Sequence, residues 1–453
     1  MSYEVSVKEQ RSSKPVIIIN SKLARNLNLL RKLRGVVSFG TQKNYVDILS
    51  SDKLDTGEIR LSTAVMEDLH IPDYPIYEIR VKDNEIILGP CIGIAVSQKF
   101  ESITKRMLKE IALHTLDYTN IHGAIIVFSL DKVDKDKRLI EGYCYNPVEE
   151  KWNKGIFPYP RAISRKTHMN QKWQNHFLSI IGDSVFNNYS FNKLDMYRWF
   201  SKEDDIRKYL PETKIFKNHN DIYEMLNKYG TVYVKPISGM KGFGIVKVTD
   251  EGNKQIFRYR ENDENIYLET EDEEKFKKIA EKLFTEDDHL IQQGLELFTF
   301  DGGIVDFRCV MQKNEAFTWQ CNGIVARVGA KESIVSNISS GGAAIPAEDF
   351  IREEMAATEY DAFDLKERLI SLCMKVCRAI DEYGFNFATL GLDIGIDNMK
   401  NIWLIEVNNR KPHPGIALRA NDIGGYYTIL AGPMHYAKAL AGFGSREDKD
   451  NVL

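Results

Sequence analysis

The feature that most constrains this chain is a glycine-rich turn between two runs of β-branched residues. From Val232 to Val248 the sequence reads as strand, turn, strand, with Gly239, Gly242 and Gly244 in the turn. Glycine has no Cβ, so backbone N–H groups there can approach phosphate oxygens closely, and Lys235 at the end of the first run adds a positive charge. The segment predicts a phosphate-binding hairpin, although taken alone it also fits an ordinary structural hairpin.

A second hairpin carries oxygen ligands. Its strands are expected at 390–395 and 401–407, on either side of a turn at 397–400. Residues i and i+2 of a strand share a face, so Glu406 and Asn408 project together and Asp393 on the facing strand can join them. Such oxygens are costly to bury without a cation, and hard oxygen ligands suit Mg²⁺. An exposed acidic face, with Asn408 in a turn, is the alternative.

Size and charge narrow the class of protein. At 453 residues the chain is too long for one core, so we expect two or three domains. The net charge of −4 gives no reason to propose a nucleic-acid or membrane partner. Neither a signal peptide nor a membrane-length apolar stretch is recognisable, so the expected compartment is the cytoplasm. The six cysteines lack C-x-x-C spacing and are expected to be reduced core thiols rather than zinc ligands or disulfides.

The spacing of apolar residues along the chain differs between three stretches. Residues 1–90 alternate over short runs, with a helix after Ser62, and predict a β-rich, barrel-like module. Residues 91–185 read as strand, helix, strand, with the helix from Ile103 to Tyr118, and predict a small α/β domain. Residues 186–453 are α+β, with a glycine-turn lobe at about 205–295 and a second lobe at about 296–440. A further strand is expected at 315–320.

The order and spacing of these motifs resemble the ATP-grasp superfamily over roughly residues 90 to 440. The resemblance implies a multidomain α+β and α/β protein in which two α+β lobes clasp ATP, preceded by a Rossmann-like domain and the N-terminal module. Glu406-Val407-Asn408 is similar to the family's Glu-x-Asn signature, and Asp393 matches its upstream acidic ligand. These three residues are the implied ligands of Mg²⁺, as two ions, with Mn²⁺ as a substitute.

The resemblance also implies an ATP site. Lys193 and Lys235 match the two phosphate lysines of the family. The run from Gln292 to Leu295 takes the place of the interlobe hinge at the adenine edge, and Glu296 is a candidate for the ribose hydroxyls. The implied ATP-binding residues are Lys193, Lys235, Ser238, Gly239, Gly242, Gly244, Gln292, Gln293, Gly294, Leu295 and Glu296.

More narrowly, the chain resembles the YheC/YheD family of endospore coat-associated ATP-grasp proteins. The N-terminal module, the Gly89-Pro90 transition and the turn at Gly341-Gly342 are similar to that family. One departure follows the Glu-x-Asn run: many ligases have a short Pro-Gly turn there, whereas this chain has a longer basic insert with Arg410 and Lys411. Substrate preference is therefore not carried over.

The implied activity is an ATP-dependent carboxylate–amine ligase that acts through an acyl phosphate on an amino acid, peptide or cell-wall-like substrate. No nucleophile elbow or H-E-x-x-H motif competes with it. Asp306-Phe307-Arg308 is similar to the family's Asp-x-Arg strand, which places Arg308 toward the γ-phosphate or the acyl phosphate, with Arg327 and Lys235 as the other catalytic residues. The candidate substrate residues are Arg327, Asn337, Gly341, Gly342 and Arg410.

Some of these assignments have a purely structural alternative. Arg327 also fits a surface salt bridge, the loop at Asn337 and Gly341-Gly342 a structural turn, and Arg410 a solvated charge. The alternatives to a ligase are a kinase that uses the same site and an ATP-binding spore-coat-associated structural protein. The expected partners are a small-molecule or peptide carboxylate and an amine, with a spore-coat or peptide partner for the N-terminal module and association with the forming spore. Oligomeric state stays open.

Overall fold

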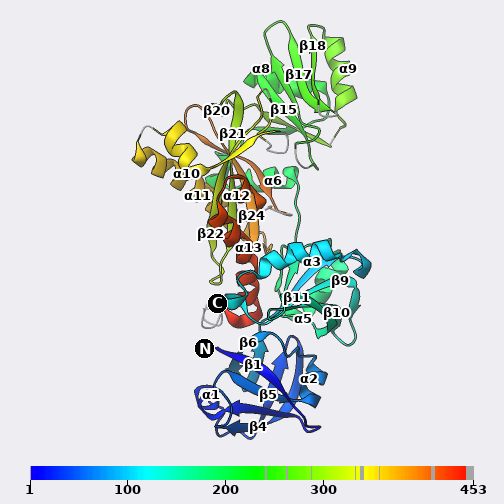
Figure 1. Cartoon of the computed structure of the whole chain (residues 1–453). Helices are drawn as coiled ribbons and strands as arrows, with labels where there is room; N and C mark the ends of the chain where they lie inside the picture. Colours follow the sequence, from blue (N-terminus) through cyan, green and yellow to red (C-terminus); the bar gives the residue numbers. More distant parts are fainter. Residues whose placement is uncertain are drawn as a thin grey trace.

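The computed structural model describes residues 2–239, 242–261, 264–286, 288–331, 333–336, 341–356, 358–409 and 414–444. Their strands form four sheets that succeed one another along an elongated molecule, with the first sheet at one end and the third at the other (Figure 1). No helix in these ranges has the length and apolar character needed to cross a membrane.

The first sheet is a closed barrel, as the alternating pattern of residues 1–90 predicts. Its strand order is β1-β5-β2-β4-β3-β7-β6, and β1 also pairs with β6. Ser62 caps the second helix by accepting a hydrogen bond from the N–H of Val65, so the predicted helix start is confirmed. The first strand and the first helix were not predicted. The elements are β1 Tyr3–Gln10, β2 Val16–Asn20, α1 Ser21–Asn26, β3 Arg34–Phe39, β4 Gln42–Ser51, β5 Glu58–Ser62, α2 Thr63–Leu69, β6 Ile76–Lys82 and β7 Glu85–Gly89.

The second sheet has the order β11-β10-β9-β8-β12-β13, and its central strand β8 pairs in parallel with β9 and β12. The helix predicted from Ile103 to Tyr118 is wrong in extent: it is broken by a 3₁₀ turn at Leu113–Thr115. The charged run from Asp131 to Lys137, which its composition predicts to be a solvated loop, begins instead as strand, because Asp134 still pairs with Leu139. The elements are β8 Cys91–Ser97, α3 Lys105–Ala112, α4 Tyr118–Ile121, β9 Ala124–Asp134, β10 Leu139–Asn146, β11 Lys151–Pro158, β12 Ala162–Arg165, α5 Gln171–Ile181 and β13 Val185–Phe186.

The third sheet is antiparallel, in the order β14-β19-β15-β16-β17-β18. Strands β15 and β16 are the predicted glycine hairpin, with Thr231 opposite Thr249. The helices His219–Tyr229 and Glu273–Leu283, which helical spacing in the sequence predicts near 220–229 and 273–283, cover this sheet, and their apolar faces share its core. The elements are α6 Lys193–Phe200, α7 Asp204–Arg207, β14 Thr213–Ile215, α8 His219–Tyr229, β15 Thr231–Pro236, β16 Val246–Asp250, β17 Gln255–Glu261, β18 Glu264–Thr270, α9 Glu273–Leu283 and β19 His289–Gln293.

The fourth sheet has the order β23-β22-β21-β24-β25, with β20 paired to β21. The strand predicted at 315–320 is wrong over residues 315–318, because Asn314 accepts hydrogen bonds from the N–H groups of Ala316 and Thr318 and closes a turn there. The elements are β20 Thr299–Phe300, β21 Gly303–Lys313, β22 Trp319–Val328, β23 Ala343–Pro346, α10 Ala347–Phe350, α11 Glu359–Glu382, β24 Thr389–Ile396, β25 Ile402–Asn408, α12 Gly415–Arg419 and α13 Ile423–Lys438.

Helix α11 packs its apolar face against the fourth sheet, and Cys373 and Cys377 lie in that core beside Cys309 of β21. All six cysteines are free, and five of them are buried. Helix α13 returns from the fourth sheet to the second, where Met434 and Tyr436 share a core with Ile92. The division of the chain into units at residues 90 and 185 stays a prediction.

Candidate functional site

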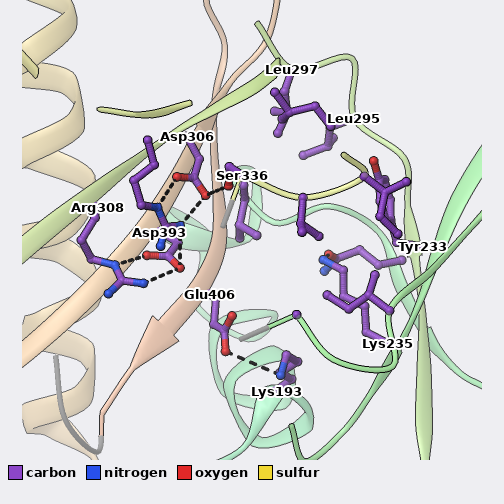
Figure 2. Close-up of a pocket in the computed structure, with 18 of the residues that line it drawn as sticks. Lys193, Tyr233, Lys235, Leu295, Leu297, Asp306, Arg308, Ser336, Asp393 and Glu406 are labelled. Carbon is purple, nitrogen blue, oxygen red and sulfur yellow. Dashed lines mark hydrogen bonds and ion pairs between the residues drawn. The ribbon is translucent and has the colours of Figure 1, made fainter. Parts of the chain in front are cut away.

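A cavity of about 350 Å³ opens between the third and fourth sheets (Figure 2). Its volume falls in the usual range for small-molecule sites. One wall is cationic and comes from β15 and α6; the opposite wall carries carboxylates and guanidinium groups from β21, β22, β24 and β25. The apolar lining includes Tyr233, Ile245, Leu295, Leu297, Ile304 and Ile405. The arrangement can hold a flat ring at one end and a charged tail at the other.

Lys235 stands at the end of β15, where the strand order places it beside β19. Its Nζ donates to Oε1 of Gln292 at 2.6 Å and lies 5.5 Å from the centre of the Tyr233 ring. Loss of water around the ammonium lowers the pKa of Lys235 to about 8, an effect that Glu406 opposes and Lys193 reinforces. A lysine with a lowered pKa facing a cavity is a functional-site candidate on physical grounds.

Lys193 connects the glycine turn to the carboxylate wall. It is the first residue of α6, whose start is fixed by a capping box between Asn192 and Asp195. Its Nζ donates to the carbonyl of Gly239 at 3.1 Å and lies 3.6 Å from Oε1 of Glu406. The structure therefore brings the two predicted lysines and a predicted metal ligand to one cavity.

Glycine is required in the turn at two described positions. Gly242 and Gly244 have φ of 77° and 75°, a region that other L-residues rarely adopt. A Cβ at Gly244 would also lie 2.9 Å from Cγ of Pro236. Gly242 lines the cavity, whereas Ser238 and Gly239 are exposed and do not.

The predicted hinge contributes only in part. Gln292, Gln293 and Leu295 line the cavity, but Gly294 and Glu296 do not. Gly294 serves close packing instead: its N–H donates to the carbonyl of Thr231, and a Cβ there would lie 2.6 Å from that residue's methyl carbon. The assignment of Glu296 to ribose stays a prediction for an exposed side chain.

Two arginines and two aspartates form a buried network on the fourth sheet. Arg308 on β21 faces Asp393 on β24 and makes a two-pronged contact, with Nη2 2.9 Å from Oδ2. Arg327 on β22 faces Asp306 on β21 in the same way, with Nε 2.6 Å from Oδ1, and its Nη2 also lies 3.0 Å from Oδ2 of Asp393. Ser336 donates a further hydrogen bond to Asp306. Paired forks of this kind hold both guanidinium planes in place.

The network splits the pKa values of the two aspartates. Burial alone would raise the pKa of Asp393, but Arg308 and Arg327 together bring it down to about 2. Burial raises the pKa of Asp306, against the attraction of Arg327. Asp393 therefore keeps its charge at neutral pH, and that charge faces the cavity.

Three oxygen-bearing side chains line the same wall, as predicted for a metal. Glu406 lies opposite Asp393 in the ladder of β24 and β25, and Nδ2 of Asn408 donates to Oδ2 of Asp393 at 3.3 Å. Among the described residues, no cluster of three His, Cys, Asp or Glu side chains could hold a metal unaided. Oδ2 of Asp393 already faces the N–H groups of Arg308, Arg327 and Asn408, whereas Oδ1 accepts one hydrogen bond, from Nε of Arg308, and keeps a second lone pair. The donor set fits Mg²⁺ whose remaining ligands are water and phosphate.

The candidate substrate residues are only partly placed. Arg327 lines the cavity, but its fork is occupied by Asp306. Gly341 and Gly342 do not line the cavity, and Asn337 and Arg410 lie outside the described residues. Their roles stay predictions.

Sequence reasoning gave no role to two side chains that shape the site. Asp306 stood in the quoted Asp-x-Arg motif, and its two-residue spacing from Arg308 on one strand face was the available signal. Ser336 lines the cavity from a loop, and no local pattern marks it. The apolar wall likewise joins residues from separate segments of the chain.

Comparison with known proteins identifies a family for this chain. The family model described as "YheC/D like ATP-grasp" matches residues 182–440. The chain is 25% identical to the endospore coat-associated protein YheD of Bacillus subtilis (strain 168) over 367 residues, which cover 78% of this chain and 79% of that protein. It is 27% identical to the endospore coat-associated protein YheC of the same organism over 207 residues, 45% of this chain and 55% of YheC. Among solved structures, the ATP-grasp ligase PsnB bound to precursor peptide PsnA2 and AMPPNP aligns with a TM-score of 0.43 at 12% identity, over 78% of this chain and 98% of PsnB.

Proposed function

This chain belongs to the YheC/D-like ATP-grasp family, and from that premise we propose that it is an ATP-dependent carboxylate–amine ligase. The predicted fold class, an ATP-grasp fold with a β-rich N-terminal region, is that of the family. The proposed substrate is an amino acid, peptide or cell-wall-like carboxylate. The observation that carries the proposal is the single cavity in which Lys193 and Lys235 face Glu406.

The proposed reaction has two steps. An oxygen of the substrate carboxylate attacks the γ-phosphorus of ATP, the bond from that phosphorus to the bridging oxygen breaks, and ADP leaves with the electron pair. The nitrogen of an amine then attacks the acyl carbon of the acyl phosphate, loses a proton and expels inorganic phosphate. Neither step needs a protein nucleophile, so catalysis depends on charge neutralisation and alignment.

Each wall of the cavity has a part in this scheme. The lysine ammonium groups at 193 and 235 offset phosphate charge, and the apolar wall receives the adenine ring. Asp393, Glu406 and Asn408 would hold Mg²⁺, as two ions with Mn²⁺ as a substitute, which supplies further positive charge at the phosphates when bound. Arg308, which is held by Asp393 and lines the cavity, is assigned to the γ-phosphate or the acyl phosphate.

The position of Arg327 supports a role at the substrate carboxylate. Its Nε and Nη2 are engaged by Asp306 and Asp393, and among the described residues no hydrogen bond is made by Nη1. A guanidinium edge held in place by two carboxylates costs little reordering when it binds an anion.

The cytoplasm, with association with the forming spore, remains the predicted location.

The test is a search for the product. The full-length protein is incubated with ATP, Mg²⁺ and pairs of amino acids or peptides, ADP and phosphate are quantified, and the product mass is measured. Ligation predicts that phosphate release needs both a carboxylate and an amine, and that the product mass equals their sum less water. A stable phosphorylated product would replace the ligase with a kinase, and ATP binding without turnover on any pair would favour a structural ATP-binding protein. Glu406→Gln serves as the inactive control.

A further inference from the structure

The second sheet ends in a strand with an open edge. Strand β11 is the outermost strand of that sheet and, among the described strands, pairs with β10 alone. A groove of about 590 Å³ runs between β11 and helix α2 of the barrel. Figure 1 shows this barrel at the opposite end of the molecule from β15, so the groove is separate from the nucleotide cavity.

The backbone of β11 presents hydrogen-bonding groups along this edge. The N–H of Tyr159 donates to the carbonyl of Arg138 at 3.1 Å, so the backbone at Tyr159 faces β10. Backbone groups alternate along an antiparallel strand, which turns Phe157 and Gly155 toward β10 and Ile156 and Lys154 away from it. The N–H and C=O groups of Ile156 and Lys154 therefore point outward, where an added strand would meet them.

The groove also offers an apolar surface. Ile156 is 53% exposed and lies on the face of β11 opposite Phe157, which packs into the barrel core, whereas Met66 and Tyr74 are half-buried against that core. Side chains of an added strand alternate between its two faces, so one set would lie against Met66 and Tyr74 and the other set beside Ile156. Exposed apolar side chains beside an open edge are normally covered or guarded in native proteins.

The charged side chains of the groove determine which charge a bound segment should carry. Glu9 and Glu67 line the groove, and neither has an ion-pair partner among the described residues. Lys154, the lysine among the lining residues of the groove, is already paired, with its Nζ 2.8 Å from Oε1 of Glu141. The uncompensated charge is therefore negative and favours a lysine or arginine on the bound segment.

We propose that this groove binds an extended peptide that adds to β11 as a further strand. The peptide directs apolar side chains on one of its faces toward Met66 and on the other face toward Ile156, and a lysine or arginine toward Glu67. Main-chain hydrogen bonds supply affinity and the groove supplies the preference for sequence, as in other strand-addition sites. The site acts independently of ATP turnover.

The probe is an acetylated and amidated hexapeptide of alternating valine and threonine with one lysine, alongside a counterpart carrying glutamate in place of lysine. Binding to the full-length protein is measured by fluorescence anisotropy, and hydrogen exchange is followed at the amides of residues 154–156. The lysine peptide is expected to bind more tightly and to slow exchange at Lys154 and Ile156. N-methylation of alternate peptide amides should abolish binding in one register and leave it in the other.

Two variants separate backbone pairing from side-chain contact. Ile156→Pro removes an outward N–H without disturbing the ladder to β10, a position where proline is tolerated. It is expected to weaken binding about tenfold, the effect of losing one or two hydrogen bonds. Ile156→Ala, the matched control, keeps the N–H and should weaken binding less.

Three results would overturn the proposal. One is unchanged hydrogen exchange at residues 154–156 with both peptides, which would mean that the lysines of β11 keep other strands from pairing with this edge. Another is equal binding to Ile156→Pro and Ile156→Ala. The third is tighter binding of the glutamate peptide than of the lysine peptide. Because nucleotide binding is measured on the same variants, failure here is distinguishable from failure of the nucleotide site.

Discussion

Lys235 makes nucleotide binding depend on pH in a way that can be worked out from its surroundings. Its pKa of about 8 means that roughly 0.9 of the molecules carry the charge at pH 7 and roughly 0.1 at pH 9. If only the charged form binds the phosphates, the association constant for ADP falls about tenfold over this range, which corresponds to about 1.4 kcal/mol. Phosphate groups are already largely ionised at pH 7, so the nucleotide contributes little to the change.

The assay is isothermal titration calorimetry of ADP with Mg²⁺ at half-unit steps from pH 7 to pH 9. Lys235→Arg is the matched control, because a guanidinium stays charged throughout and its affinity should not vary with pH. Lys235→Met should bind weakly at every pH. A wild-type affinity that does not change with pH, or an equal slope in Lys235→Arg, would refute the assignment of this lysine to phosphate.

The same lysine affects stability with a defined sign. Its pKa in the folded protein lies below the unfolded value of about 10.4, so the unfolded chain binds more protons between about pH 8 and pH 10.4. The free energy of unfolding of the nucleotide-free protein should therefore rise with pH in this window, relative to Lys235→Met. Urea denaturation at fixed temperature measures the difference, and a gap between the two proteins that does not vary with pH would contradict the lowered pKa.

Three further predictions concern the two walls of the cavity. Glu406→Gln should fold normally, since its side chain is 34% exposed, but lose ATP turnover by roughly a hundredfold; unchanged ADP release would reject the metal assignment. Asp306→Asn leaves Arg327 with a weakened buried partner and should lower the free energy of unfolding by about 3 kcal/mol or more in urea denaturation, whereas no change would mean that the pair is dispensable. Gly244→Ala should weaken ADP binding, because a Cβ at this positive φ would also contact a proline. Gly230→Ala is the control: its φ is also positive but the space around it is open, so it should cost about 1 kcal/mol of stability and leave ADP binding unchanged. Equal losses of ADP binding in the two variants would mean that the glycine turn has no special role.

Local patterns predicted the parts of the site that depend on neighbouring residues in sequence. The glycine turn and the shared face of Glu406 and Asn408 each follow from backbone conformation or two-residue periodicity. Such signals extend over only a few residues. The predicted strand at 315–320 was wrong over residues 315–318 for the same reason, because hydrogen bonds accepted by the side-chain oxygen of Asn314 favour a turn over the apolar pattern.

Local patterns could not predict which strand lies at the edge of a sheet or which residues face each other on neighbouring strands. Strand β11 has a weakly alternating pattern, and nothing in its residues shows that it ends a sheet beside the barrel. Likewise, the sequence placed Arg327 at a substrate carboxylate without knowing that Asp306 lies opposite it on the neighbouring strand.

The amino-acid sequence by itself determined the family, the two hairpins and the side chains proposed to bind phosphate and metal, because these follow from residue type and short spacing. Only the tertiary structure decided which charges meet. It paired Arg308 with Asp393 and Arg327 with Asp306, set Lys193 against Glu406, and withdrew water from Lys235. The physical reason is that electrostatic interaction and desolvation depend on distance and burial, which arise when segments far apart in the chain pack together.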